Sequence, residues 1–90
     1  MKKTFYKDPD SYLDYYFDWG DWLLPGDTIV THNIIAPPEI IVDGSFIIGD
    51  KVKVNLMGGV LNDVYIITCS IVTNDTRADQ RSIRIIMIDR

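Results

Sequence analysis

The chain has 90 residues, of which 47% are hydrophobic and 11% aromatic, and its net charge is −4. This composition is typical of one folded domain, expected to span residues 1–90, and the acidic balance argues against nucleic-acid binding, which relies on clustered Lys and Arg. One cysteine, Cys69, excludes an internal disulfide framework and a cysteine-rich zinc site.

The N-terminal sequence, MKKTFYKDPD, lacks the apolar stretch of a signal peptide, and no run of about 18 apolar residues follows it. We therefore expect a soluble protein that is made in a cytoplasm and has no membrane partner. Residues 1–7 are expected to form a loose N-terminal arm.

Residues 12–18 alternate between two sets of side chains, as in a β-strand. The set expected to face the core is Leu13, Tyr15 and Phe17. The opposite set, a candidate contact surface for a neighbouring protein, is Tyr12, Asp14, Tyr16 and Asp18. Trp19, Trp22 and Leu23 follow at helical spacing, which predicts a short turn with both tryptophans as candidate structural residues.

The rest of the chain is rich in β-branched residues at a period of two, bounded by glycine and proline. The segments predicted as strands lie near residues 27–34, 40–42, 45–48, 51–57, 64–72 and 82–89. Asp43-Gly44 predicts a hairpin turn between the second and third of them, and Gly49-Asp50 separates the third from the fourth. About seven short strands predict an all-β fold, a small immunoglobulin-like antiparallel β-sandwich.

The strand near residues 64–72 carries two candidate structural residues. Tyr65 lies at its start, after a corner, and resembles the tyrosine corner of immunoglobulin-like domains, in which the hydroxyl bonds to upstream backbone. Cys69 shares the inward face with Tyr65, which favours a small core side chain over a reactive thiol.

No arrangement of residues predicts catalysis, a metal or a cofactor. The chain has one histidine, His32, with no acid or cysteine at metal-binding spacing. Asp8, Asp10 and Asp14 suggest calcium ligands, but the Gly and Glu that an EF-hand loop requires are missing. We therefore expect no enzymatic activity.

An apolar patch is expected outside the core on the last two strands, because inward Tyr65, Ile67, Ile83 and Ile85 leave other large residues outward. These candidate interface residues are Ile66, Val72, Ile86 and Ile88. Such a patch is more often a protein interface than a ligand site. The alternative is that the N-terminal segment covers it.

The order of several motifs resembles a family of small tailed-phage and prophage proteins, the fibre–tail adaptors. The matching residues in the first half are Lys7-Asp8-Pro9, Leu13-Asp14-Tyr15, Phe17-Asp18-Trp19, Trp22-Leu23 and Gly26-Asp27-Thr28-Ile29. Those in the second half are Leu56-Met57-Gly58-Gly59, Tyr65, Thr68, Ile71, Arg77, Asp79, Arg81, Ser82 and Ile83. The segment HNIIAPPEII departs from the family pattern, since a Trp is missing and Glu39 replaces a Gly.

The resemblance implies an immunoglobulin-like structural protein of the virion, made in the bacterial host cytoplasm. Its partners would be other tail, connector or fibre proteins and further copies of itself, for example in a ring. An alternative from another class is a carbohydrate- or receptor-binding module of a phage tail that stacks ligands on Tyr15, Tyr16, Trp19 and Trp22. A third is a host-directed regulator that acts as a free monomer.

Overall fold

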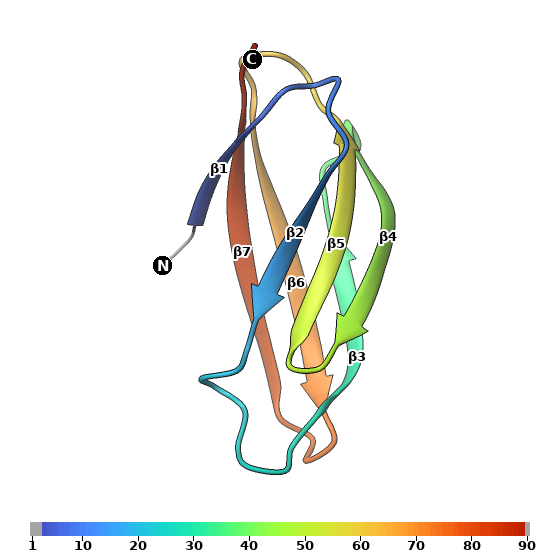
Figure 1. Ribbon diagram of the computed structural model, residues 1–90, viewed down its shortest axis with the longest axis vertical. Helices are drawn as coiled ribbons and strands as arrows, with labels where there is room; N and C mark the ends of the chain where they lie inside the picture. Colours follow the sequence, from blue (N-terminus) through green and yellow to red (C-terminus); the bar gives the residue numbers. More distant parts are fainter. Residues whose placement is uncertain (1–2, 90) are drawn as a thin grey trace.

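The computed structural model describes residues 3–89, which form seven β-strands in two packed sheets (Figure 1). The strands are β1 (Lys3–Lys7), β2 (Leu13–Asp18), β3 (Ile29–Ile35), β4 (Ile40–Ile48), β5 (Lys51–Gly58), β6 (Val64–Thr73) and β7 (Ala78–Met87). Within these residues no helix is long and apolar enough to pass through a membrane.

The strand order is β1-β7-β6-β3 in one sheet and β2-β5-β4 in the other. Immunoglobulin constant-type domains place their second, fifth and fourth strands in one sheet and their seventh, sixth and third in the other, as here. All pairings are antiparallel except that of β1 with β7, which is parallel. The predicted all-β sandwich of about seven strands is therefore confirmed.

The core lies between the two sheets and is formed by alternate residues of β2, β5, β6 and β7. Val52, Val54 and Leu56 of β5 are fully buried, and they face inward residues of β6 and β7 such as Ile67 and Ile85. Each such aliphatic side chain contributes about 1.5–3 kcal/mol when it is removed from water. This pairing of two apolar inner faces holds the sheets together.

The prediction of separate strands at 40–42 and 45–48 is wrong. One strand, β4, runs through Asp43-Gly44, and both of its halves pair with β5. The register shifts between Val42 and Ser45, so the glycine serves a β-bulge instead of a chain reversal. The chain reverses at Gly49-Asp50, where Gly49 has a φ of 61°.

The N-terminal segment is also more ordered than expected. Residues 3–7 form β1, with Lys3 opposite Ile83 and Lys7 opposite Met87, instead of a loose arm. Parallel pairing with the last strand holds the segment, and the Lys7 side chain is fully buried. Its ammonium group donates to the carbonyl oxygens of Asp8 (2.9 Å) and Gly58 (3.0 Å). Residues 1 and 2 of the expected arm lie outside the described residues.

Candidate interaction surfaces

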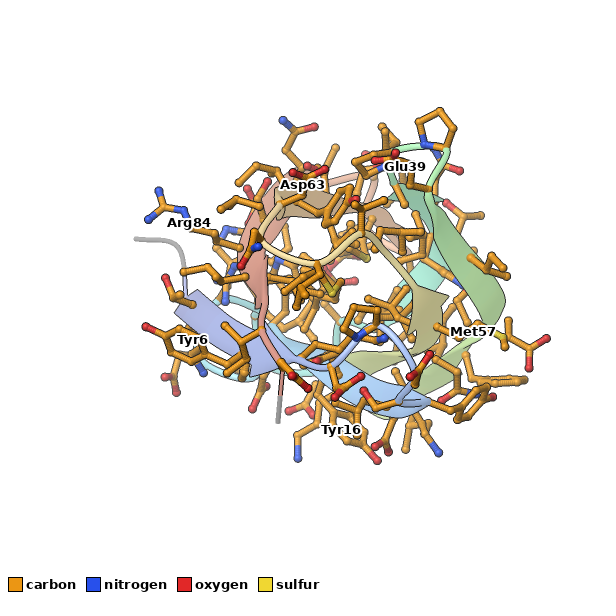
Figure 2. All side chains as sticks on the ribbon, turned by 90° about the horizontal axis from the view of Figure 1, so that it is seen from above. Tyr6, Tyr16, Glu39, Met57, Asp63 and Arg84 are labelled. Carbon is orange, nitrogen blue, oxygen red and sulfur yellow. The ribbon has the colours of Figure 1, made fainter. Side chains whose placement is uncertain are left out.

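The outer face of the β2-β5-β4 sheet carries the first predicted contact set. Figure 2 shows Tyr16 and Met57 on this side of the sandwich and Tyr6 and Arg84 on the other. Tyr12, Asp14, Tyr16 and Asp18 are all exposed, as expected for the outward phase of this strand. The Asp14 carboxylate lies 3.7 Å from the ammonium group of Lys53 on β5, an exposed ion pair that contributes little stability.

The Tyr12 hydroxyl reaches across this face toward β4. The pKa of Tyr12 is raised by loss of solvation and by a hydrogen bond to the Asp43 carboxylate, while Asn55 acts in the opposite direction. The Tyr12 hydroxyl and the Asp43 carboxylate therefore lie close together on this outer face.

The predicted patch on the other sheet forms only in part. Ile66 is exposed, and Ile86 and Ile88 are half-buried, at one end of the outer face. Ile86 lies in one row with Tyr6 of β1 and Val64 of β6, both more than half exposed. The strand β1 lies beside β7 in the same sheet, so it extends this apolar end instead of covering it.

Val72 does not belong to that patch. It lies six residues beyond Ile66 on β6, which is about 20 Å at the rise of an extended strand. Its neighbours are Thr31 on β3 and Ala78 on β7, in a shallow hollow that also includes Asn33 and Gln80. The outward phase was predicted correctly, but residues that share a face of a long strand need not lie together.

The two tryptophans join the end of β2 to the start of β7. Trp19 is fully buried, its indole nitrogen donates to the Asp79 carboxylate at 2.9 Å, and its ring stacks with Phe17. The Arg81 guanidinium lies 5.3 Å from the Trp19 ring, and it also donates to the carbonyl oxygen of Asp18. Two motif segments that are about 60 residues apart in the chain therefore meet in one cluster.

The neighbouring Trp22 ring is half-buried beneath Arg77. The Arg77 guanidinium lies 4.0 Å from the ring centre and donates to the Trp22 carbonyl oxygen at 3.2 Å. Among the residues proposed as a sugar-stacking platform, Tyr15 and Trp19 are buried and only Tyr16 is exposed. The structure does not assemble that platform, because Tyr15 and Trp19 pack in the core and do not lie beside Tyr16 in solvent.

Tyr65 has the geometry of a tyrosine corner. Its hydroxyl accepts a hydrogen bond from the backbone N–H of Val60 (2.9 Å) and donates to the Glu39 carboxylate (2.7 Å). Burial and the bond to Glu39 raise the pKa of the Tyr65 phenol. Glu39, which departs from the family pattern, therefore ties the β3–β4 connection to this corner.

The single cysteine and histidine occupy structural positions. Cys69 is fully buried between the sheets, and burial raises the pKa of its thiol to about 12. His32 is half-buried on β3, and its ring Nε2 lies 2.8 Å from the Ser45 hydroxyl on β4. Within residues 3–89, no three histidine, cysteine or acidic side chains are placed to share a metal ion.

One apolar surface was missed by the sequence analysis. It is the edge formed by β4, and its large exposed side chains are Ile41, Val42, Phe46, Ile47 and Ile48. Dividing this segment into two strands joined by a hairpin hid it. The available signal was the apolar sequence itself, IIV and FII, which lacks the charges that protect most edge strands.

Comparison with known proteins agrees with the earlier resemblance. No curated protein matches the chain. The model of the family described as "Podophage GP4 fiber-tail adaptor protein gp77" matches residues 7–86. This range includes both tryptophan motifs and the tyrosine corner. The chain therefore belongs to this family of phage fibre–tail adaptor proteins, which are structural components of the virion.

Proposed function

We propose that this protein is a non-enzymatic adaptor in a phage particle that joins tail and fibre components and assembles in multiple copies. The family match over residues 7–86 carries this proposal. The protein would be made in the cytoplasm of the bacterial host and then incorporated into the virion.

The surface chemistry supports a role in protein contacts. One outer face has an apolar end around Tyr6, Val64, Ile66 and Ile86, and exposed apolar surface of this kind is typical of interfaces. The side chains best suited to nucleophilic or acid–base chemistry are engaged elsewhere, since Cys69 is buried and His32 contacts Ser45. These contacts favour a binding role over catalysis.

The test is incorporation into particles. Phage that lacks this gene is complemented with wild-type protein, with Ile86→Lys or with Gln80→Lys, and purified particles are assayed by mass spectrometry and for bound fibres. We expect wild type and Gln80→Lys in several copies per particle, and Ile86→Lys at a much lower level. Circular dichroism checks that each variant is folded. Absence of wild-type protein from particles, or fibres attached normally without the gene, would contradict the proposal.

A further inference from the structure

The edge strand β4 is unlike the other three edge strands of the sandwich, β1, β2 and β3. β2 presents Asp14 and Asp18. β3 presents the polar residues Thr31 and Asn33 between two exposed aliphatic residues, Val30 and Ile35, whereas β4 exposes five large apolar side chains. The nine residues of β4 include one charged residue, Asp43, and six large aliphatic or aromatic side chains. Natural edge strands are normally protected from pairing by charges or prolines, and β4 has only its bulge.

The apolar side chains of β4 are exposed on both faces of the strand. Ile41, Phe46 and Ile48 point outward and are 53%, 51% and 49% exposed. Val42 and Ile47 lie opposite the fully buried Leu56 and Val52 and therefore point inward, yet they remain 36% and 37% exposed. The inward side chains of β4 are thus only partly covered, although the β5 residues that they oppose are fully buried.

The opposite side of the sandwich has a hollow beside Lys3, Phe17 and Arg81, and it is closed between the rest of β1 and the start of β2. The rings of Phe5 and Tyr15 meet there with their centres 4.9 Å apart, and Lys7 is buried at its upper end. On the other side, β3 and β4 are linked by a side-chain hydrogen bond between His32 and Ser45. The β4 side is therefore where added apolar chain would bury the most unprotected surface.

The one charge on β4 leaves the main-chain groups of the free edge accessible. Asp43 lies at the bulge, and the Tyr12 hydroxyl binds its carboxylate from the outer face of the sheet. β4 is the last strand of its sheet, so its main-chain groups that point away from β5 face no other strand of that sheet. An antiparallel strand can hydrogen-bond to such groups without disturbing this contact.

We infer that β4 pairs with β4 of a second copy of this chain, antiparallel and about a twofold axis near Asp43 and Gly44. The strand reads IIV-DGS-FII, with an apolar triplet on each side of a polar centre. A twofold axis at that centre places the apolar triplet of one copy against that of the other, as a self-complementary interface requires. This inference deepens the proposed multi-copy assembly and rests on it.

The bulge brings the correct faces together. In antiparallel pairing, residues directly opposite each other share a face of the sheet. The register shift between Val42 and Ser45 places Ile41 and Phe46 both outward, although their numbers differ by an odd count. Ile41 of one copy therefore lies beside Phe46 and Ile48 of the other, as direct and diagonal neighbours.

The pairing unites the two β2-β5-β4 sheets into one sheet of six strands. Nine residues at about 3.3 Å each give an edge of about 30 Å. Main-chain hydrogen bonds would form along this edge, and apolar side chains would be buried on both faces of the sheet. Strand-addition complexes combine the same two contributions. The inward Val42 and Ile47 gain cover from the partner's chain.

Size-exclusion chromatography with light scattering over a range of protein concentrations tests the association. We expect wild type to form dimers and both Phe46→Lys and Ile48→Lys to be folded monomers, with the dissociation constant raised at least about tenfold. The control is Leu24→Lys, an equally exposed residue (53%) in the connection between β2 and β3, which should still dimerise. A wild type that is monomeric at every concentration, or a Phe46→Lys variant that still dimerises, would overturn the inference.

A cysteine pair tests the register without adding charge. In Ile41→Cys/Phe46→Cys the two thiols of one chain are about 16 Å apart, too far for an internal disulfide. We expect oxidation to give disulfide-linked dimers, while the control Leu24→Cys/Ile41→Cys, with one cysteine outside the proposed interface, gives far fewer. Equal cross-linking in both variants would contradict the inference. Because these assays use purified protein, their outcome is independent of whether the chain is found in particles.

Discussion

Trp19 and Asp79 are joined by a hydrogen bond of 2.9 Å from the indole nitrogen to the carboxylate, although they are 60 residues apart in the chain. The bond connects the turn after β2 with the first residues of β7. Trp19 is fully buried, so its N–H has no access to solvent as a substitute partner. The bond belongs to a set of contacts that joins the segment with Trp19 and Trp22 to the later segment with Arg77, Asp79 and Arg81.

Asp79→Ala should therefore destabilise the fold. The substitution leaves the buried indole N–H without an acceptor, which costs about 1–3 kcal/mol of unfolding free energy. Urea unfolding followed by tryptophan fluorescence measures this. Asp75→Ala is the control, because its exposed side chain should change stability by no more than about 0.5 kcal/mol. Equal effects of the two substitutions would show that the bond contributes nothing specific.

Asp27 should make stability depend on acid pH. Burial acts to raise the pKa of its carboxyl. The Thr73 side chain and the backbone N–H groups of Asp75 and Thr28, which both donate to its Oδ1, outweigh this, so the pKa is lowered in the folded protein. A lowered folded pKa gives stability that is complete above the unfolded value of about 3.9 and is lost as the pH falls below it. Wild type should exceed Asp27→Asn in stability most at pH 6–7, and the difference should shrink between pH 4 and 2. A difference that is constant across this range would contradict the assignment.

The Cys69 thiol should be unreactive in the folded protein. Burial raises its pKa to about 12, so almost no thiolate is present at pH 8, and the side chain has no exposed surface. Reaction with a thiol reagent at pH 8 should proceed only after denaturant is added. Rapid labelling of the native protein would show that the sandwich opens frequently at β6.

Removal of the Tyr65 hydroxyl should weaken the corner before β6. Tyr65→Phe leaves the Val60 N–H without its partner and frees Glu39, with an expected loss of about 1–2 kcal/mol. Tyr16→Phe, which removes a hydroxyl from a residue that is 48% exposed, is the matched control and should change little. Thermal unfolding of the two variants measures the contrast, and equal melting temperatures would refute it.

A side chain at Gly59 should destabilise the fold more than one at Gly26. A Cβ at this position would lie 2.5 Å from the terminal carbon of Met87, and the residue has a φ of 103°. At Gly26 the φ is also positive, at 82°, but no atom lies within 4 Å of a Cβ. Both alanine substitutions incur backbone strain of about 1–2 kcal/mol, and Gly59→Ala adds a steric cost. Unfolding by urea should therefore show the larger loss for Gly59→Ala, and the reverse order would contradict the packing described.

The strand faces and the fold class follow from local sequence. Alternation of Val52, Val54 and Leu56 with polar residues predicts which side chains are buried, because successive side chains of any strand point to opposite faces. The start of β6 likewise predicts the corner at Tyr65 from nearby residues alone. These features need no knowledge of which strands pair.

Strand partners and their registers were decided by tertiary structure. Asp43-Gly44 is compatible with a hairpin or a bulge, and the choice depends on whether residues 40–42 also pair with β5, which they do. Neighbours far along the chain also decide that β1 pairs with β7 in parallel. They likewise decide that Val72 lies apart from Ile66 and Ile86. Alternation of side chains is a property of each strand by itself. Pairing arises from the combined burial of side chains from distant segments. The exposed β4 edge can therefore be recognised only once the sheets are assembled.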